Sequence, residues 1–114
     1  MQPKFEQQMK KGVLDMLVLK LLAQEKKYGY QLISELREKS GEVISLKEGT
    51  LYPILYRLED EGLIESRWNE PKGREVSRKY YDITDKGKQV LCEMFTLWSS
   101  FSETIKGIME EESV

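Results

Sequence analysis

Residues 45–62, SLKEGTLYPILYRLEDEG, carry a helical pattern with a defined beginning and end. Ser45 and Glu48 have the spacing of a capping box, in which each side chain binds the free backbone amide of the other residue. Gly62 favours termination just after Glu61. Four apolar residues fall on one face of the segment: Leu51, Ile54, Leu55 and Leu58. The segment therefore predicts an amphipathic helix that buries this face.

Pro53 lies inside this predicted helix and has no amide hydrogen to donate. Its ring would press on the carbonyl of Gly49, four residues earlier, so we expect either a kink or a helix that restarts with Thr50 as its cap. In both cases residues 47–53 form an irregular tip with accessible backbone.

Two helices are predicted before this segment. Apolar residues from Val13 to Leu22 recur at helical spacing and indicate a helix over about residues 8–24. Tyr28-Gly29-Tyr30 begins a second helix, and Ser40-Gly41 ends it, because glycine is favoured just past a helix C-terminus.

A hairpin and a long helix are predicted after the segment. Residues 63–69 and 76–84 are rich in β-branched and aromatic side chains, and Pro71-Lys72-Gly73-Arg74 between them is typical of a turn. Thr84 then caps a helix that extends to about Glu111.

The predicted order of three helices, a hairpin and a long helix is that of a winged helix-turn-helix protein. We therefore expect a mainly α fold with a small β-hairpin. Residues 1–84 would form a DNA-binding domain, and residues 85–114 a C-terminal dimerisation helix. In this arrangement the third helix is the candidate for the DNA major groove, and the hairpin of residues 63–84 is the wing.

Composition excludes several classes of function. The 114 residues include no His and one Cys, so general acid–base catalysis by His, Cys/His zinc sites and internal disulfides are not expected. The carboxylate clusters at residues 59–61 and 110–112 have no accompanying metal-ligand or phosphate-loop pattern. The sequence predicts no enzyme, cofactor or metal site. With neither an export signal nor the roughly 20 apolar residues of a membrane span, we expect a cytoplasmic protein without membrane contact.

The net charge of −2 conceals an uneven distribution along the chain. Residues 1–66 carry −1, residues 67–88 carry +3 and residues 89–114 carry −4. A basic wing beside an acidic tail is suited to contact phosphates, and such binding weakens steeply with salt. The alternative is that the basic turn is only a solvated loop.

Two groups of side chains are candidates for DNA contacts. The first group consists of the side chains of the third helix that lie outside its apolar face, together with the accessible backbone of Gly49. The second group consists of the cations of the wing. For Tyr52 and Tyr56, the alternative is that their rings pack under the wing. The predicted DNA-binding residues are Lys47, Gly49, Thr50, Tyr52, Arg57, Lys72, Arg74 and Lys79, and Tyr56 and Arg78 are further candidates on the same elements.

The last helix contains an apolar seam with heptad spacing: Leu91, Met94, Trp98, Phe101, Ile105 and Ile108. Such a pattern predicts a symmetric homodimer, which also suits operator half-sites about one DNA turn apart. The alternative is that the seam packs against its own domain. Trp98 and Phe101 are poorly suited to tight coiled-coil packing. They could line a slot for a planar apolar ligand together with Met94 and Met16, or Trp98 could be an ordinary interface anchor.

The chain resembles the PadR-type transcriptional regulators over about residues 10–98. The motifs that carry the resemblance are GVLDMLVL at 12–19, YGYQL at 28–32, GTLYPILYRLE at 49–59 with GLI at 62–64, and RKYYDIT at 78–84 with Gly87 after it. The resemblance implies a dimeric repressor whose third helix and wing contact DNA, here through Thr50, Tyr52, Lys72 and Arg74.

The short C-terminal helix is similar to that of the compact branch of the family. Residues 95–99, FTLWS, are similar to those of a multidrug-binding lactococcal member, and this likeness implies that Trp98 stacks planar drugs across the dimer. We therefore expect a dimeric repressor of a palindromic DNA operator, released by a planar hydrophobic effector. The alternative is a winged-helix module for protein–protein contacts without specific DNA binding.

Overall fold

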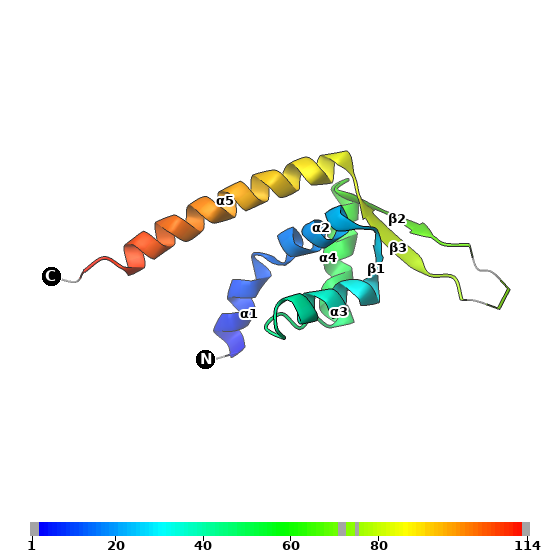
Figure 1. Ribbon diagram of the computed structural model, residues 1–114, viewed down its shortest axis with the longest axis horizontal. Helices are drawn as coiled ribbons and strands as arrows, with labels where there is room; N and C mark the ends of the chain where they lie inside the picture. The colour runs from blue at the N-terminus through cyan, green and yellow to red at the C-terminus, as the bar shows by residue number, and fades with distance from the viewer. Residues whose placement is uncertain (1–2, 71–72, 75, 113–114) are drawn as a thin grey trace.

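The computed structural model describes residues 3–70, 73–74 and 76–112, and within them are five helices and a small sheet whose hairpin projects away from the helices (Figure 1). The helices are α1 (Pro3–Lys11), α2 (Leu14–Gln24), α3 (Gly29–Lys39), α4 (Glu48–Asp60) and α5 (Asp85–Met109). The strands are β1 (Lys27–Tyr28), β2 (Ile64–Trp68) and β3 (Lys79–Ile83). The predicted fold class, mainly α with a small hairpin, is confirmed.

The sheet has the order β1-β3-β2 and is antiparallel throughout. In the wing, Ile64 pairs with Ile83 and Trp68 pairs with Lys79. β1 was not predicted, because two residues are too few to show a strand periodicity. It pairs Tyr28 with Tyr80 and so joins the start of α3 to the wing.

The core lies between α2, α3, α4 and the sheet. Its fully buried residues from the helices are Val18, Leu19, Leu32, Leu51, Leu55 and Leu58, each with no exposed surface. Ile64 and Tyr81 cover the core from the sheet, with 2% and 1% of their surfaces exposed. Each buried aliphatic side chain contributes about 1.5–3 kcal/mol, so this cluster fixes which face of α4 points outward.

The first predicted helix is broken in two, so its expected span of residues 8–24 was wrong. α1 ends at Lys11, and a turn at Gly12 and Val13 precedes α2, with the Val13 amide bound to the Lys10 carbonyl at 3.0 Å. Glycine destabilises a helix interior. None of the described α1 side chains is buried, so core packing does not hold the two helices in line.

The predicted capping box at Ser45 and Glu48 was also wrong. Lys47 is the residue that caps α4, and its carbonyl accepts hydrogen bonds from Thr50 and Leu51 at 3.0 Å each. Ser45 is exposed and lies outside the helix, whereas Leu46 packs against the core. The packed Leu46 side chain sets the direction of the chain, so the helix begins later than the local motif suggests.

α4 is continuous from Glu48 to Asp60, so it does not restart at Thr50, and the irregular tip expected at residues 47–53 is helical from Glu48 onward. Both Gly49 and Pro53 are exposed. Pro53 has no amide hydrogen, so the Gly49 carbonyl has no helical hydrogen-bond donor. Because Gly49 is exposed, water can bind this carbonyl instead, which lowers the free-energy cost of a proline in the helix.

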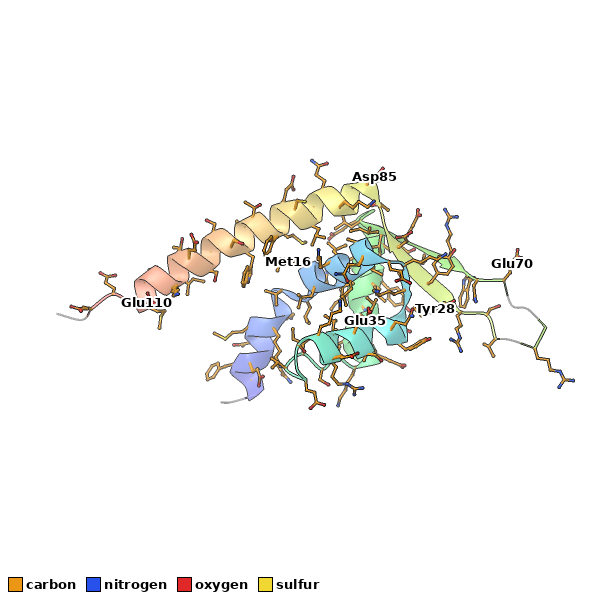
Figure 2. All side chains as sticks on the ribbon, in the orientation of Figure 1. Met16, Tyr28, Glu35, Glu70, Asp85 and Glu110 are labelled. Carbon is orange, nitrogen blue, oxygen red and sulfur yellow. The ribbon has the colours of Figure 1, made fainter. Side chains whose placement is uncertain are left out.

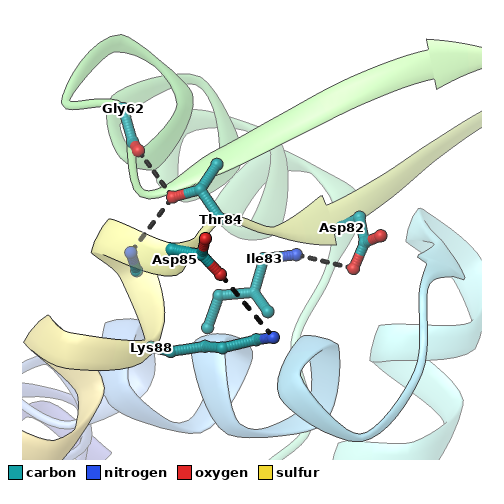
Figure 3. A network of polar contacts seen from close by, with 7 residues as sticks. Gly62, Asp82, Ile83, Thr84, Asp85 and Lys88 are labelled. Carbon is teal, nitrogen blue, oxygen red and sulfur yellow. Dashed lines mark hydrogen bonds and ion pairs between the residues drawn. The ribbon is translucent and has the colours of Figure 1, made fainter.

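α5 begins at a junction that joins the ends of α4 and β3 (Figure 3). The Thr84 hydroxyl donates to the Gly62 carbonyl at 2.8 Å and accepts from the Gly87 amide at 3.0 Å, so Thr84 is the predicted cap. Gly62 has the positive φ of 76° that favours glycine. The junction directs α5 across α2 and beyond the domain, and the molecule measures 71 Å along its longest axis (Figure 1).

No helix in the described part of the chain is long and apolar enough to cross a membrane.

Candidate nucleic-acid interface

α4 presents a narrow exposed face opposite its buried one. Leu51, Leu55 and Leu58 point inward, and the helical period therefore places Gly49, Pro53 and Tyr56 at the centre of the outward face. Tyr56 has 57% of its surface exposed. Gly49 and Thr50 are exposed as predicted, as is Lys47 just before the helix. Pro53 is not among the contacts predicted from the sequence.

Tyr52 lies on the flank of α4 that faces the wing and is half-buried. A methyl group built at Gly29 would come within 2.7 Å of the Tyr52 hydroxyl, so this ring packs closely over the start of α3. Its ring centre is 6.2 Å from that of Tyr56. Tyr52 therefore forms a wall of the interface rather than its most exposed part.

Arg57 lies on the other flank and is held by α2. Its guanidinium donates to the Asp15 carboxylate at 2.5 Å. The hydrogen bond and the charge of Asp15 raise the pKa of Arg57 further above its usual value. The structure therefore does not bring Arg57 together with the wing residues, and its charge is largely balanced by Asp15.

A group of aromatic and cationic side chains connects α3 to the wing, and we call it the aromatic–cationic surface: Tyr28, Tyr30, Trp68, Arg78 and Lys79. The rings of Tyr28 and Tyr30 stack with centres 6.0 Å apart, at the position labelled Tyr28 in Figure 2. The Arg78 guanidinium lies 5.7 Å from both ring centres and donates to the Tyr30 hydroxyl at 3.3 Å. These contacts fix a cation beside the exposed face of α4.

Tyr28, Tyr30 and Trp68 were not predicted as site residues. Trp68 has 65% of its surface exposed and Tyr30 has 53%, which is high for aromatic side chains in a folded domain. The only sequence signal was the Tyr-Gly-Tyr motif at the start of α3. Its proximity to Arg78, 48 residues later, depends on the β1–β3 pairing.

The predicted wing cations are only partly described. Arg74 is exposed in the turn, next to Gly73 with a φ of 66°, and Lys79 is half-buried on β3 with its ammonium 5.8 Å from the Tyr81 ring centre. Lys72 lies outside the described residues. Burial raises the pKa of the Tyr81 hydroxyl to about 12, with smaller effects from the charges of Tyr52, Tyr56 and Glu59. Tyr81 therefore stays neutral beneath the aromatic–cationic surface near neutral pH.

The apolar seam of α5 has a packed part and an exposed part, because α5 runs past the end of its own domain. Leu91 and Met94 are half-buried and pack against the core of their own domain. Farther along, Trp98, Phe101, Ile105 and Ile108 have exposed fractions of 45%, 57%, 59% and 63%. Phe95 stacks on Trp98 with ring centres 6.2 Å apart and planes at 10°. Met16 is half-buried on α2, below the span of α5 (Figure 2).

The comparisons with known proteins agree with this geometry. The profile described as "Transcriptional regulator PadR-like family" matches residues 18–93. The chain is 34% identical over 100 residues to uncharacterized protein X of Lysinibacillus sphaericus, covering 88% of this chain and 91% of that one. It is 35% identical over 94 residues to the negative transcriptional regulator PadR of Bacillus subtilis, covering 82% of this chain but only 51% of that one. The chain thus spans about half the length of that relative.

Solved structures show the same similarity. A PadR family transcriptional regulator from Eggerthella lenta has a TM-score of 0.86 and 35% identity, covering 96% of this chain and 92% of that chain. A PadR-like transcriptional regulator from Bacillus cereus has a TM-score of 0.75 and 37% identity, covering 92% and 99%.

Proposed function

Because the chain belongs to the PadR-like family of transcriptional regulators, we propose that it acts as a homodimeric repressor of a palindromic operator. The family is one of DNA-binding regulators, which are not enzymes. In this proposal residues 1–84 bind DNA and residues 85–114 form the dimer.

The observation that carries the proposal is the position of the aromatic–cationic surface beside the exposed face of α4. An outward helix face can enter the major groove, while Arg78, Lys79 and the wing residue Arg74 follow the phosphates on one side. Lys47, Gly49 and Thr50 lie at the leading end of the helix. Lys72 is included among the proposed phosphate contacts on the basis of the sequence alone. Asp60 and Glu61 at the trailing end repel phosphates and restrict the contact to the part of α4 that precedes them.

Replacing Arg74 and Arg78 by alanine should weaken binding to the protein's own upstream DNA by roughly 10–100-fold, since each solvent-exposed phosphate contact contributes about 1 kcal/mol net. The slope of log affinity against log salt between about 50 and 200 mM should become shallower by about one for each phosphate that is no longer neutralised. Fluorescence anisotropy with a labelled fragment measures both quantities.

The matched control replaces Lys88 and Lys106, two exposed cations on α5, by alanine. It changes the net charge equally and should leave the slope unchanged. Equal slopes for the wing and α5 variants would contradict the wing assignment. If upstream DNA is bound no better than random DNA while a protein partner copurifies, the protein–protein module replaces the repressor.

We also propose an effector site at the part of the seam that α5 leaves exposed. The parallel rings of Phe95 and Trp98 offer a stacking surface for a planar hydrophobic molecule, with Phe101, Met94 and Met16 as adaptable neighbours. Binding there would favour a spacing of the two α4 helices that no longer matches successive major grooves.

A planar cationic dye should quench the fluorescence of Trp98 saturably in a Trp68→Phe variant, which retains Trp98 as its only tryptophan. Trp98→Ala should bind the dye roughly tenfold more weakly, because it removes a stacking ring from each copy. Dye binding is measured by the anisotropy of the dye itself, and light scattering checks that the variant remains a dimer. Unchanged affinity in a dimeric Trp98→Ala would contradict the site.

A further inference from the structure

The outward face of α4 lacks the side chains that usually read guanine and adenine. Gly49, Pro53 and Tyr56 occupy its centre, and Thr50 lies beside them. Guanine is commonly read by Arg or Lys and adenine by Asn or Gln, whereas thymine offers a methyl group to apolar contacts. Arg57, the only arginine on α4, is held by Asp15 at 2.5 Å.

We propose that α4 recognises thymine methyl groups, through the Pro53 ring, the Tyr56 ring and the Thr50 methyl. This inference rests on the proposed function, because it requires α4 to lie in the major groove. It assigns selectivity for suitably oriented A·T pairs to α4, while the wing supplies affinity through phosphates. The exposed fraction of Tyr56, 57%, leaves its ring available for such a contact.

Gly49 gives the same face a close approach to DNA. A methyl group built at Gly49 meets no atom within 4 Å, so the protein itself does not require glycine there. Glycine inside a helix costs about 0.5–1 kcal/mol relative to alanine. A bare backbone at this position lets base edges come nearer to Pro53, one helical turn later.

The test compares two duplexes of the bound upstream fragment, one natural and one with deoxyuridine in place of thymine within the half-sites. The replacement removes only the methyl group and keeps base pairing. Wild-type protein should bind the deoxyuridine duplex roughly fourfold more weakly for each thymine methyl that α4 touches. Pro53→Ala and Tyr56→Ala should each reduce this ratio. Both residues are exposed, and alanine at position 53 restores a helical amide, so neither variant should unfold.

Arg74→Ala is the matched control, because it should weaken binding to both duplexes and preserve their ratio. Gly49→Ala should raise the unfolding free energy, because alanine is the better helix former. The same variant should bind the natural duplex at least about tenfold more weakly. Gly107→Ala on α5, where an added methyl group also meets no atom within 4 Å, should leave the DNA affinity unchanged.

The outcomes separate this inference from the proposed function. If wild-type protein shows no preference for upstream DNA, the proposed function fails and the inference fails with it. If it binds both duplexes specifically and equally, the function stands and methyl recognition is overturned. If the thymine preference persists unchanged in both Pro53→Ala and Tyr56→Ala, the residue assignment is overturned.

Discussion

Gly87→Ala should lower the unfolding free energy by about 3 kcal/mol or more, which is a large fraction of the stability of a small domain. A methyl group built at Gly87 would lie 2.0 Å from the Leu63 carbonyl oxygen and 2.7 Å from Cγ1 of Ile83. The first obstacle is backbone, so no side-chain rotation relieves it. Either α5 or the start of β2 must move, which breaks the junction at Thr84.

Urea denaturation followed by far-UV circular dichroism measures this decrease. Gly107→Ala is the matched control in the same helix, where the added methyl meets nothing within 4 Å. It should stabilise the protein by about 0.5–1 kcal/mol, since alanine is the better helix former. Similar unfolding free energies for the two variants would show that the close packing of α5 on Leu63 is incorrect.

Ile105→Glu should convert the proposed dimer to monomers and weaken operator binding by roughly 100-fold or more. Ile105 is 59% exposed in the single chain and lies midway along the free part of the seam. A glutamate there would be buried in the proposed dimer interface, and an unpaired buried charge is strongly destabilising. A monomer binds only one half-site, so the other half-site no longer adds to the affinity.

Light scattering after size-exclusion chromatography measures the mass, and a gel shift measures operator binding. Thr96→Glu adds the same charge on the opposite side of α5 and should leave both unchanged. A dimeric Ile105→Glu with normal DNA affinity would show that the seam does not join the two copies. Phe5 and Met9 on α1, 54% and 77% exposed, are then the next apolar surface to test.

The composition of the α4 face could be predicted from the sequence, because the 3.6-residue period alone separates Leu51 and Leu55 from Gly49 and Tyr56. The start of the helix could not. Ser45 and Glu48 satisfy a local rule, but packing of Leu46 against the core outweighs the small free energy of one cap.

The charged partners of the site residues could not be predicted either. Arg57 and Asp15 are 42 residues apart, and Tyr30 and Arg78 are 48 apart. Periodicity indicates which side of a helix is polar, but not which polar group of another element comes to lie beside it. For this reason the sequence predicted Arg57 as a DNA contact alongside the wing cations, whereas in the structure its guanidinium pairs with the Asp15 carboxylate.

The amino-acid sequence by itself determined the order of α2, α3, α4, the wing and α5, with their buried faces and the heptad seam, because these follow from short-range periodicity and turn chemistry. Tertiary structure alone decided how α5 leaves the domain, and hence that Leu91 and Met94 are covered while Trp98 and Ile105 remain exposed. The same packing decided that Tyr30 meets Arg78. These features depend on the junction at Thr84 and on the β1–β3 pairing, which join distant segments through contacts that a local pattern does not contain.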